Sequence, residues 1–226
     1  MNFKNIIPII FFSCITAAAS CQQSNDQVKN IADKLSKKET TVSAVLTDPS
    51  LMPLHSLTAF RDIIKQHANA EKLVLNTDKE PGIKITVKGI IKDKKGNLMA
   101  NNLVYVYQTS TEGWYSDTAP HIQKNEGDRR HARLFGYFKT GSKGEFEFST
   151  IKPNGYPNSE LPAHIHIEIF LKNEKLFITE LLFDDDPRLV GDIRARSIAE
   201  KFLIEKNTGT QSEPVYSYMI QNPYAD

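Results

Sequence analysis

The chain has 226 residues, a length that suits one domain or one domain with an appendage. Hydrophobic residues make up 40% of the sequence and charged residues 24%, so the chain can bury a core and is not broadly disordered. The formal net charge of +1 excludes the strongly basic surface that nucleic-acid binding requires.

Both cysteines of the chain lie in a segment typical of a bacterial lipoprotein signal. Lys4 is the only charge in residues 1–20, an apolar stretch follows it, and small residues stand directly before Cys21, in a pattern that resembles a lipobox. We expect cleavage after residue 20, which discards Cys14, and a lipid on Cys21 that tethers the protein to the cell envelope. The alternative is an ordinary signal cut near Ala19 that leaves Cys21 as a free thiol.

Residues 21–79 are expected to form a tether and a short helical segment. The stretch 22–30 is polar, and apolar residues then recur at helical spacing over 28–38 and again over 51–70. The run Thr47-Asp48-Pro49-Ser50 between these stretches is a helix-start or turn signal.

Residues 80–226 are expected to form the main domain, because the hydrophobic period changes there to two. A long polar loop is expected over 109–130 and a late helix over 192–204. Strands are expected over 83–90, 103–107, 135–138, 145–148, 164–170, 176–183 and 215–220. Many short strands separated by turns predict an all-β fold, an antiparallel β-sandwich with a small N-terminal helical extension.

His164 and His166 form the most informative pair of side chains. Residues two apart in a strand point to the same face, so the two imidazoles converge while Ile165 and Ile167 face the core. Paired neutral imidazoles are common ligands of transition metals, copper and zinc among them. The alternative is a pair of polar residues on a solvated face.

The sequence around this pair resembles the intradiol ring-cleavage dioxygenases, the family of the protocatechuate and catechol dioxygenases. The run G-E-F-E-F-S-T-I-K-P-N-G-Y-P at 144–157 is followed by P-A-H-I-H at 162–166, and V-Y-V-Y-Q at 104–108 precedes G-W-Y at 113–115. The resemblance extends in the same order from about residue 84 to residue 183. It implies a non-haem Fe(III) held by Tyr115, Tyr156, His164 and His166.

The chemistry of phenols agrees with this ligand set. A phenol ordinarily has a pKa near 10, and a bound trivalent cation favours phenolate, a hard oxygen donor. The resemblance implies that Tyr156 also takes a proton from the substrate, which makes it both ligand and catalytic base. The implied reaction uses O2 to cleave a catechol-type aromatic diol between its two hydroxylated carbons.

Two positions depart from the family pattern. Leu161 stands where the family has an arginine that stabilises charge on the substrate, and Glu180 stands where it has a glutamine. One cation near developing charge is worth about 100-fold in rate, so the expected activity needs a substitute. The candidates in the polar loop are Arg129, Arg130 and Arg133.

The polar loop and the acidic run at 184–187 contain further polar residues. His121 and His131 of the polar loop are expected to be solvated or to line the pocket, and the run 184–187 (Asp-Asp-Asp-Pro) is expected to form a turn. The rival to an enzyme is a non-catalytic envelope lipoprotein that keeps the sandwich and the metal site as a binding or scaffolding module. Membrane contact is expected only through the lipid, and no pattern indicates an oligomeric state.

Overall fold

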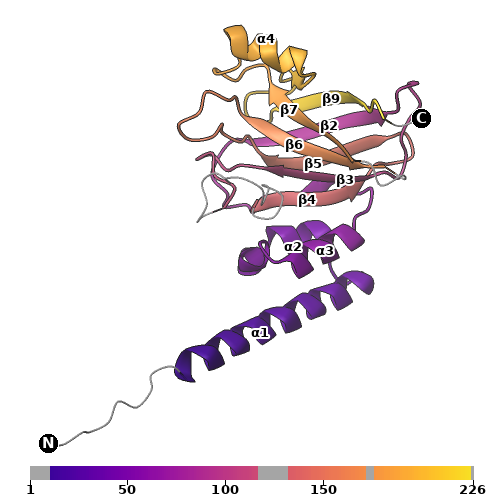
Figure 1. Ribbon diagram of the computed structural model, residues 1–226. Coiled ribbons are helices and arrows are strands. Elements are labelled where there is room, and N and C mark those ends of the chain that lie inside the picture. Colours follow the sequence, from indigo (N-terminus) through magenta and orange to yellow (C-terminus); the bar gives the residue numbers. More distant parts are fainter. Residues whose placement is uncertain (1–10, 117–131, 172–175, 225–226) are drawn as a thin grey trace, which may run out of the picture.

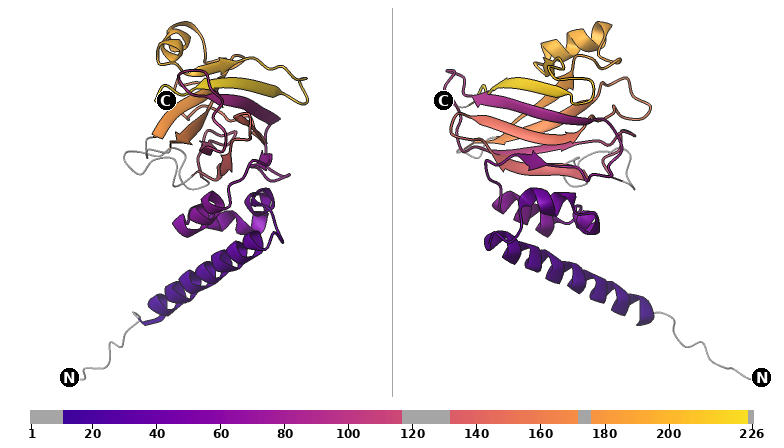
Figure 2. Two further views of the ribbon diagram at one scale, coloured as in Figure 1. Left: turned by 90° about the vertical axis from the view of Figure 1, so that its right-hand side faces the viewer. Right: turned by 180° about the vertical axis from the view of Figure 1, so that it is seen from behind.

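The computed structural model describes residues 11–116, 132–171 and 176–224, with side chains described from residue 22 onward. Two stacked sheets form the body of the protein, a helical segment lies against it, and a long helix leads away (Figures 1 and 2). The helices are α1 (Phe11–Ser36), α2 (Val42–Thr47), the 3-10 helix η1 (Pro49–Leu54), α3 (Thr58–Gln66) and α4 (Gly191–Ala199). The strands are β1 (Leu73–Val74), β2 (Lys84–Lys92), β3 (Leu103–Gln108), β4 (Leu134–Lys139), β5 (Glu145–Ile151), β6 (His164–Phe170), β7 (Leu176–Phe183), β8 (Leu203–Glu205) and β9 (Val215–Gln221).

The strands form a four-stranded sheet in the order β1-β5-β2-β9 and a five-stranded sheet in the order β4-β3-β6-β7-β8. The predicted β-sandwich with an N-terminal helical extension is confirmed. The sheets are mixed, however, and not purely antiparallel: β1 pairs with β5, β2 with β9 and β7 with β8 in parallel. Parallel neighbours need a long connection, and α4 supplies one between β7 and β8.

The helical part differs from the sequence prediction in three places. Residues 22–30, expected as a tether, continue α1, because Val28, Ile31 and Leu35 give this polar helix a buried face. The segment before residue 80 also contains β1, which belongs to the sandwich. The late helix ends at Ala199, since Lys201 adopts the left-handed conformation with φ of 63° and the chain enters β8.

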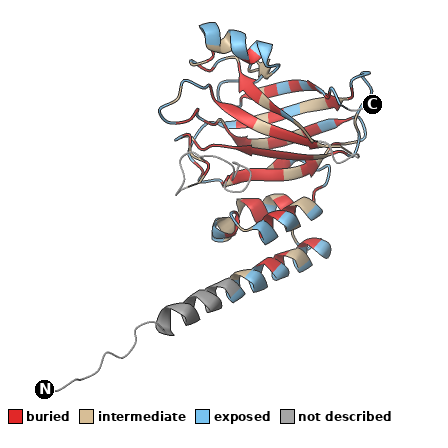
Figure 3. Ribbon diagram, in the orientation of Figure 1, coloured by how far each residue is buried: buried red, intermediate tan, exposed pale blue. Residues whose placement is uncertain are grey.

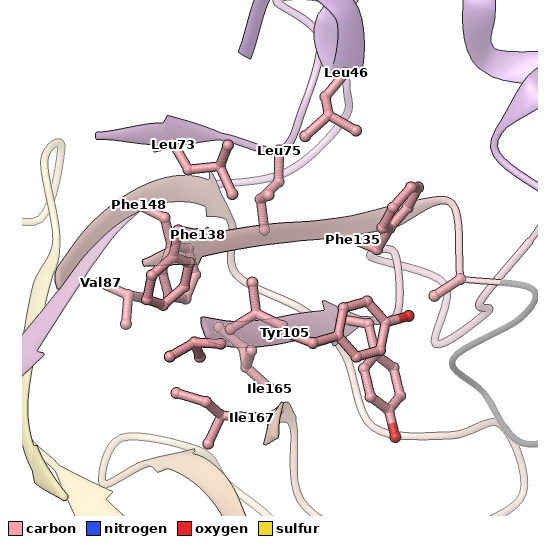
Figure 4. Close-up of a cluster of buried hydrophobic side chains, with 14 of the residues drawn as sticks. Leu46, Leu73, Leu75, Val87, Tyr105, Phe135, Phe138, Phe148, Ile165 and Ile167 are labelled. Atoms are coloured by element: carbon pink, nitrogen blue, oxygen red, sulfur yellow. The ribbon is translucent and has the colours of Figure 1, made fainter. Parts of the chain in front are cut away.

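One continuous core joins the two sheets to the helical segment. Val87 and Phe148 of the four-stranded sheet face Ile165 and Ile167 of the other sheet, and Leu46 reaches down from α2 (Figure 4). Buried residues accordingly dominate the central strands and one side of α2 and α3, whereas α4 is mostly exposed (Figure 3). Strand β6 lies at the centre of the five-stranded sheet, paired with β3 on one side and β7 on the other.

Among the described residues, no helix has both the length and the apolar character that crossing a membrane requires.

Candidate metal centre

Four side chains that the sequence singled out meet at one end of β6. The Tyr115 hydroxyl lies 2.5 Å from the Tyr156 hydroxyl and 3.0 Å from His166 Nε2. The Tyr156 hydroxyl lies 3.0 Å from His164 Nε2 and 3.3 Å from His166 Nε2, and the two Nε2 atoms are 3.1 Å apart. The structure therefore brings Tyr115, Tyr156, His164 and His166 together at a single point.

The four donors come from three parts of the chain. His164 and His166 alternate with buried Ile165 along β6, as the period-two pattern predicts. Tyr156 lies in the connection between β5 and β6, and Tyr115 follows β3 in a loop closed by a hydrogen bond from Ser110 N to the Trp114 carbonyl. Both tyrosines are buried.

Gly113 allows the two tyrosine-bearing loops to meet. Its φ of +79° is the left-handed conformation, and a Cβ placed on it would lie 2.3 Å from the Gly155 carbonyl oxygen. A side chain at this position would therefore push the Tyr115 loop away from the Tyr156 loop. Beyond the loop, the Tyr115 carbonyl accepts a 2.6 Å hydrogen bond from Arg133 N.

The two imidazoles are oriented for binding a metal through Nε2. His164 Nδ1 donates to the Pro162 carbonyl at 2.8 Å, which leaves the lone pair on Nε2 facing the phenols. The His166 ring stacks on Tyr107 with centroids 4.6 Å apart. Burial, and secondly the neighbouring His164, hold the pKa of His166 well below its usual value. A neutral imidazole is the form that ligates a metal.

These four donors fit a ferric ion. Donors bound to one ion at about 2.0–2.1 Å lie roughly 3 Å apart, which is the spacing seen here. Two phenols that lose their protons supply two negative charges and hard oxygen donors, a good match for a trivalent cation. His164, His166 and Glu180 also form a group with ligand atoms within 4.8 Å of one another. Glu180 lies 3.7 Å from His166 Nδ1, on the side of that ring away from the phenols, so it suits an outer partner of the ligand.

A pocket of about 290 Å³ opens beside Tyr156 and His164. Leu161 and Glu180, the two departures from the family pattern, line it, and α4 and the chain after it close the opposite wall. Arg196 of α4 contributes a guanidinium to this wall, which sequence reasoning missed. No local pattern marks Arg196, because its place depends on how α4 folds back over the sheet.

The loop arginines do not supply the expected cation where they are described. Arg133, one of the three candidates to replace the arginine missing at Leu161, is instead engaged by Glu80 through two hydrogen bonds. The buried Glu80 carboxylate holds this guanidinium in an ion pair. Arg129, Arg130, His121 and His131 lie outside the described residues.

Comparison with known proteins shows the family to which the chain belongs. A family model described as "Dioxygenase" matches residues 59–221, and the chain belongs to this family, that of the intradiol dioxygenases. The chain is 25% identical over 163 residues to catechol 1,2-dioxygenase 1 of Acinetobacter lwoffii, covering 64% of this chain and 50% of that protein. It is 32% identical over 124 residues to the protocatechuate 3,4-dioxygenase beta chain of Burkholderia cepacia, covering 49% of each.

Solved structures support the same fold. The dioxygenase domain of a dioxygenase–carbohydrate-binding protein fusion from Streptomyces sp. SirexAA-E superposes with a TM-score of 0.52 at 21% identity, covering 70% of this chain and 90% of that one. Catechol 1,2-dioxygenase from Acinetobacter sp. ADP1 gives a TM-score of 0.53 at 16% identity, covering 68% and 57%. The chain spans about half the length of the curated relatives it matches.

Proposed function

We propose that this intradiol dioxygenase family member uses Fe(III), held by Tyr115, Tyr156, His164 and His166, to cleave a catechol-type ring with O2. The observation that carries the proposal is the convergence of four donor atoms within 2.5–3.3 Å. The names of the relatives, catechol 1,2-dioxygenase and protocatechuate 3,4-dioxygenase, support an aromatic diol as the substrate.

A ferric ion held by Tyr115, Tyr156, His164 and His166 would supply the Lewis-acid chemistry that makes a bound diol reactive toward O2. The chain's own residues have separate tasks. His164 and His166, fixed by Pro162 and by stacking on Tyr107, anchor the site. Tyr156 borders the pocket, so its phenol oxygen is placed to take a proton from an incoming diol hydroxyl. Tyr115 is buried deeper and stays as an anchor.

The pocket supplies orientation and excludes water. A catechol ring bound at the donor cluster would extend between Leu161 and Leu182 toward α4, where it would meet Ile193 and Phe202. The lining mixes apolar side chains such as Ile193 and Phe202 with charged ones such as Glu180 and Arg196, so it offers both packing for a flat ring and polar groups that can orient it.

The test begins with the purified protein after aerobic loading with iron. We expect about one iron per chain and a visible tyrosinate-to-Fe(III) absorption band, followed by oxygen uptake with catechol, protocatechuate or hydroxyquinol. A colourless, iron-free protein would contradict the ferric site. Bound iron with no oxygen uptake on any of these diols would instead favour a non-catalytic envelope module.

We also propose that the protein is a lipoprotein anchored through Cys21 to the bacterial cell envelope. The support is the sequence pattern before Cys21 together with the direction of α1, which leads away from the sandwich (Figure 1). The mass of the N-terminal peptide from membrane-extracted protein tests this proposal. An unmodified Cys21 thiol would rule the anchor out.

A further inference from the structure

The turn that follows β7 holds the loop that carries Tyr156 and leads into His164. Asp186 lies in this turn and is buried, with 8% of its surface exposed. Its Oδ2 accepts a hydrogen bond from Ala163 N at 2.9 Å, and its Oδ1 accepts one from Arg188 N at 2.8 Å. One carboxylate thus ties the residue before His164 to the turn.

Arg188 reaches the same loop from the other side. Its Nη1 donates long hydrogen bonds to the Tyr156 carbonyl at 3.4 Å and to the Leu161 carbonyl at 3.3 Å. Gly155 makes room for this contact, since a Cβ there would lie 2.2 Å from Arg188 Nη1. A single guanidinium therefore joins two carbonyls near the two ends of the Tyr156 loop.

The other two donors are held by different parts of the molecule. The Tyr115 carbonyl accepts its hydrogen bond from Arg133 N, and His166 stacks on Tyr107 within the five-stranded sheet. The loop between β5 and β6 carries Tyr156 and leads directly into His164, the first residue of β6, and residues 156 and 161–163 belong to no strand.

We propose that Asp186 and Arg188 are positioning residues that fix Tyr156 and His164 as one pair of metal donors. The proposal rests on the proposed function, because its purpose is to preorganise half of the ligand set for iron. Hydrogen bonds to charged groups are stronger than those between neutral groups. A carboxylate and a guanidinium are therefore suited to holding a loop whose backbone is not paired in a sheet. Neither side chain touches the four donor atoms, so both act through the backbone.

The experiment compares Arg188→Ala, Arg188→Lys and Asp186→Asn with two matched controls. Arg194→Ala removes an arginine that pairs with Asp184 at 2.6 Å, and Asp185→Asn removes a carboxylate that contacts Lys152 and Tyr216. Both controls alter charges beside the same turn. Arg194 pairs with Asp184, outside the Tyr156 loop, and Asp185 contacts that loop only at Lys152, its first residue. Iron per chain, the rate of iron loss to a chelator and the tyrosinate-to-Fe(III) band are measured in all six proteins, wild type included.

We expect Arg188→Ala and Asp186→Asn to bind iron roughly 10–100-fold more weakly, as other outer partners of metal ligands do. The tyrosinate band should lose intensity, because Tyr156 no longer stays on the metal. Arg188→Lys should recover part of both signals, since an ammonium still donates to carbonyl oxygens. The two controls should match the wild type.

Hydrogen–deuterium exchange of the metal-free protein tests whether Asp186 holds the loop before His164, independently of iron binding. Asp186→Asn should speed exchange at the Ala163 amide in the metal-free protein, and Asp185→Asn should not. Suppose that the wild type binds iron and that the Arg188 and Asp186 variants match the controls in iron affinity and band intensity. The positioning role is then overturned, and the proposed function stands. If the wild type binds no iron, the proposed function fails and this role fails with it, whatever the exchange data show.

Discussion

The hydroxyl oxygens of Tyr115 and Tyr156 lie 2.5 Å apart, although the two residues are 41 positions apart in the sequence. Both phenols are buried, and both oxygens also contact His166 Nε2. Each phenol can donate its proton to a neighbouring Nε2 atom, and a cation at their centre would replace those protons and engage all four donor atoms at once. The pair is therefore the most direct indicator of what the site binds.

Substituting one tyrosine at a time should show that each supplies a phenolate. Tyr115→Phe and Tyr156→Phe should each retain some iron but lose roughly half of the tyrosinate-to-Fe(III) absorption, because a coordinated phenolate is replaced by a ring without a donor. Tyr218→Phe is the matched control, since Tyr218 is equally buried and its hydroxyl donates to the Leu182 carbonyl at 2.9 Å. Full iron content and an unchanged band in either variant would remove that tyrosine from the ligand set.

The sequence predicts the regular strands well and the short or polar elements badly. Strands β6 and β7 have the predicted bounds, because alternating apolar residues along a half-buried strand are a strong signal. Strands β1 and β8 have only two and three residues, too few for any periodicity. Helix α1 continues through a polar stretch because tertiary packing of a few residues such as Val28 decides its structure, and that packing is not local.

Some residues of the candidate site can be recognised from the sequence and others cannot. Residues in a compact run, such as Tyr156, His164 and His166, are recognisable because the chain itself keeps them near one another. Arg188 and Arg196 carry no such pattern, since their roles arise only when the chain after β7 returns to the loop and to the pocket. From the sequence, the candidates for the cation missing at Leu161 lie in the polar loop, whereas Arg196 lines the pocket from α4.

Filling the pocket should impair substrate binding and spare the iron. Ile193 lines the 290 Å³ pocket from α4, and Ile193→Trp should raise KM for catechol roughly tenfold by occupying space that the ring needs. Ile198→Trp is the control, because Ile198 lies on the same helix, is 59% exposed and is not among the residues that line this pocket. Iron content and the visible band should stay at wild-type levels in both. An unchanged KM in Ile193→Trp would place the substrate elsewhere.

Removing the guanidinium of Arg196 should slow turnover. Arg196→Gln takes away the positive charge of a residue that lines the pocket, and kcat/KM should fall by about 100-fold if that charge stabilises the reacting diol. Arg194→Gln, on the same helix but paired with Asp184, should change kcat/KM little.

A second substitution provides the converse test of the same charge. Leu161 lines the same pocket and is 42% exposed, so Leu161→Arg has room to place a guanidinium there. In the Arg196→Gln background it should restore part of the lost kcat/KM. If Arg196→Gln matches the wild type, or if Leu161→Arg lowers activity further, Arg196 is not the substitute for the missing cation.

His55 should make the metal-free protein sensitive to acid. Its ring is 2% exposed, stacks on Phe60 at 5.1 Å and approaches Arg133 through Nδ1, 2.8 Å from the carbonyl oxygen. Burial lowers the pKa of His55 from 6.5 to about 4 and outweighs the opposing effect of that hydrogen bond. The nearby cations Arg61 and Arg133 lower the pKa further. Above pH 6.5 the ring is neutral in both folded and unfolded chains, so it adds no pH dependence.

As the pH falls from 6.5 toward 4, His55 binds a proton in the unfolded chain but not in the folded chain. The free energy of unfolding therefore decreases. At 1.36 kcal/mol per pKa unit, the loss due to His55 approaches about 3 kcal/mol. Urea unfolding of wild type and His55→Gln at pH 7.5 and pH 4.5 measures it. The variant cannot titrate at residue 55, so its stability should fall by about 3 kcal/mol less than that of the wild type between these pH values. Subtracting the two proteins also removes the contribution of buried His166, which both share. Equal losses in the two proteins would show that the acid sensitivity arises at other groups and that His55 accepts a proton in the folded chain as readily as in the unfolded one.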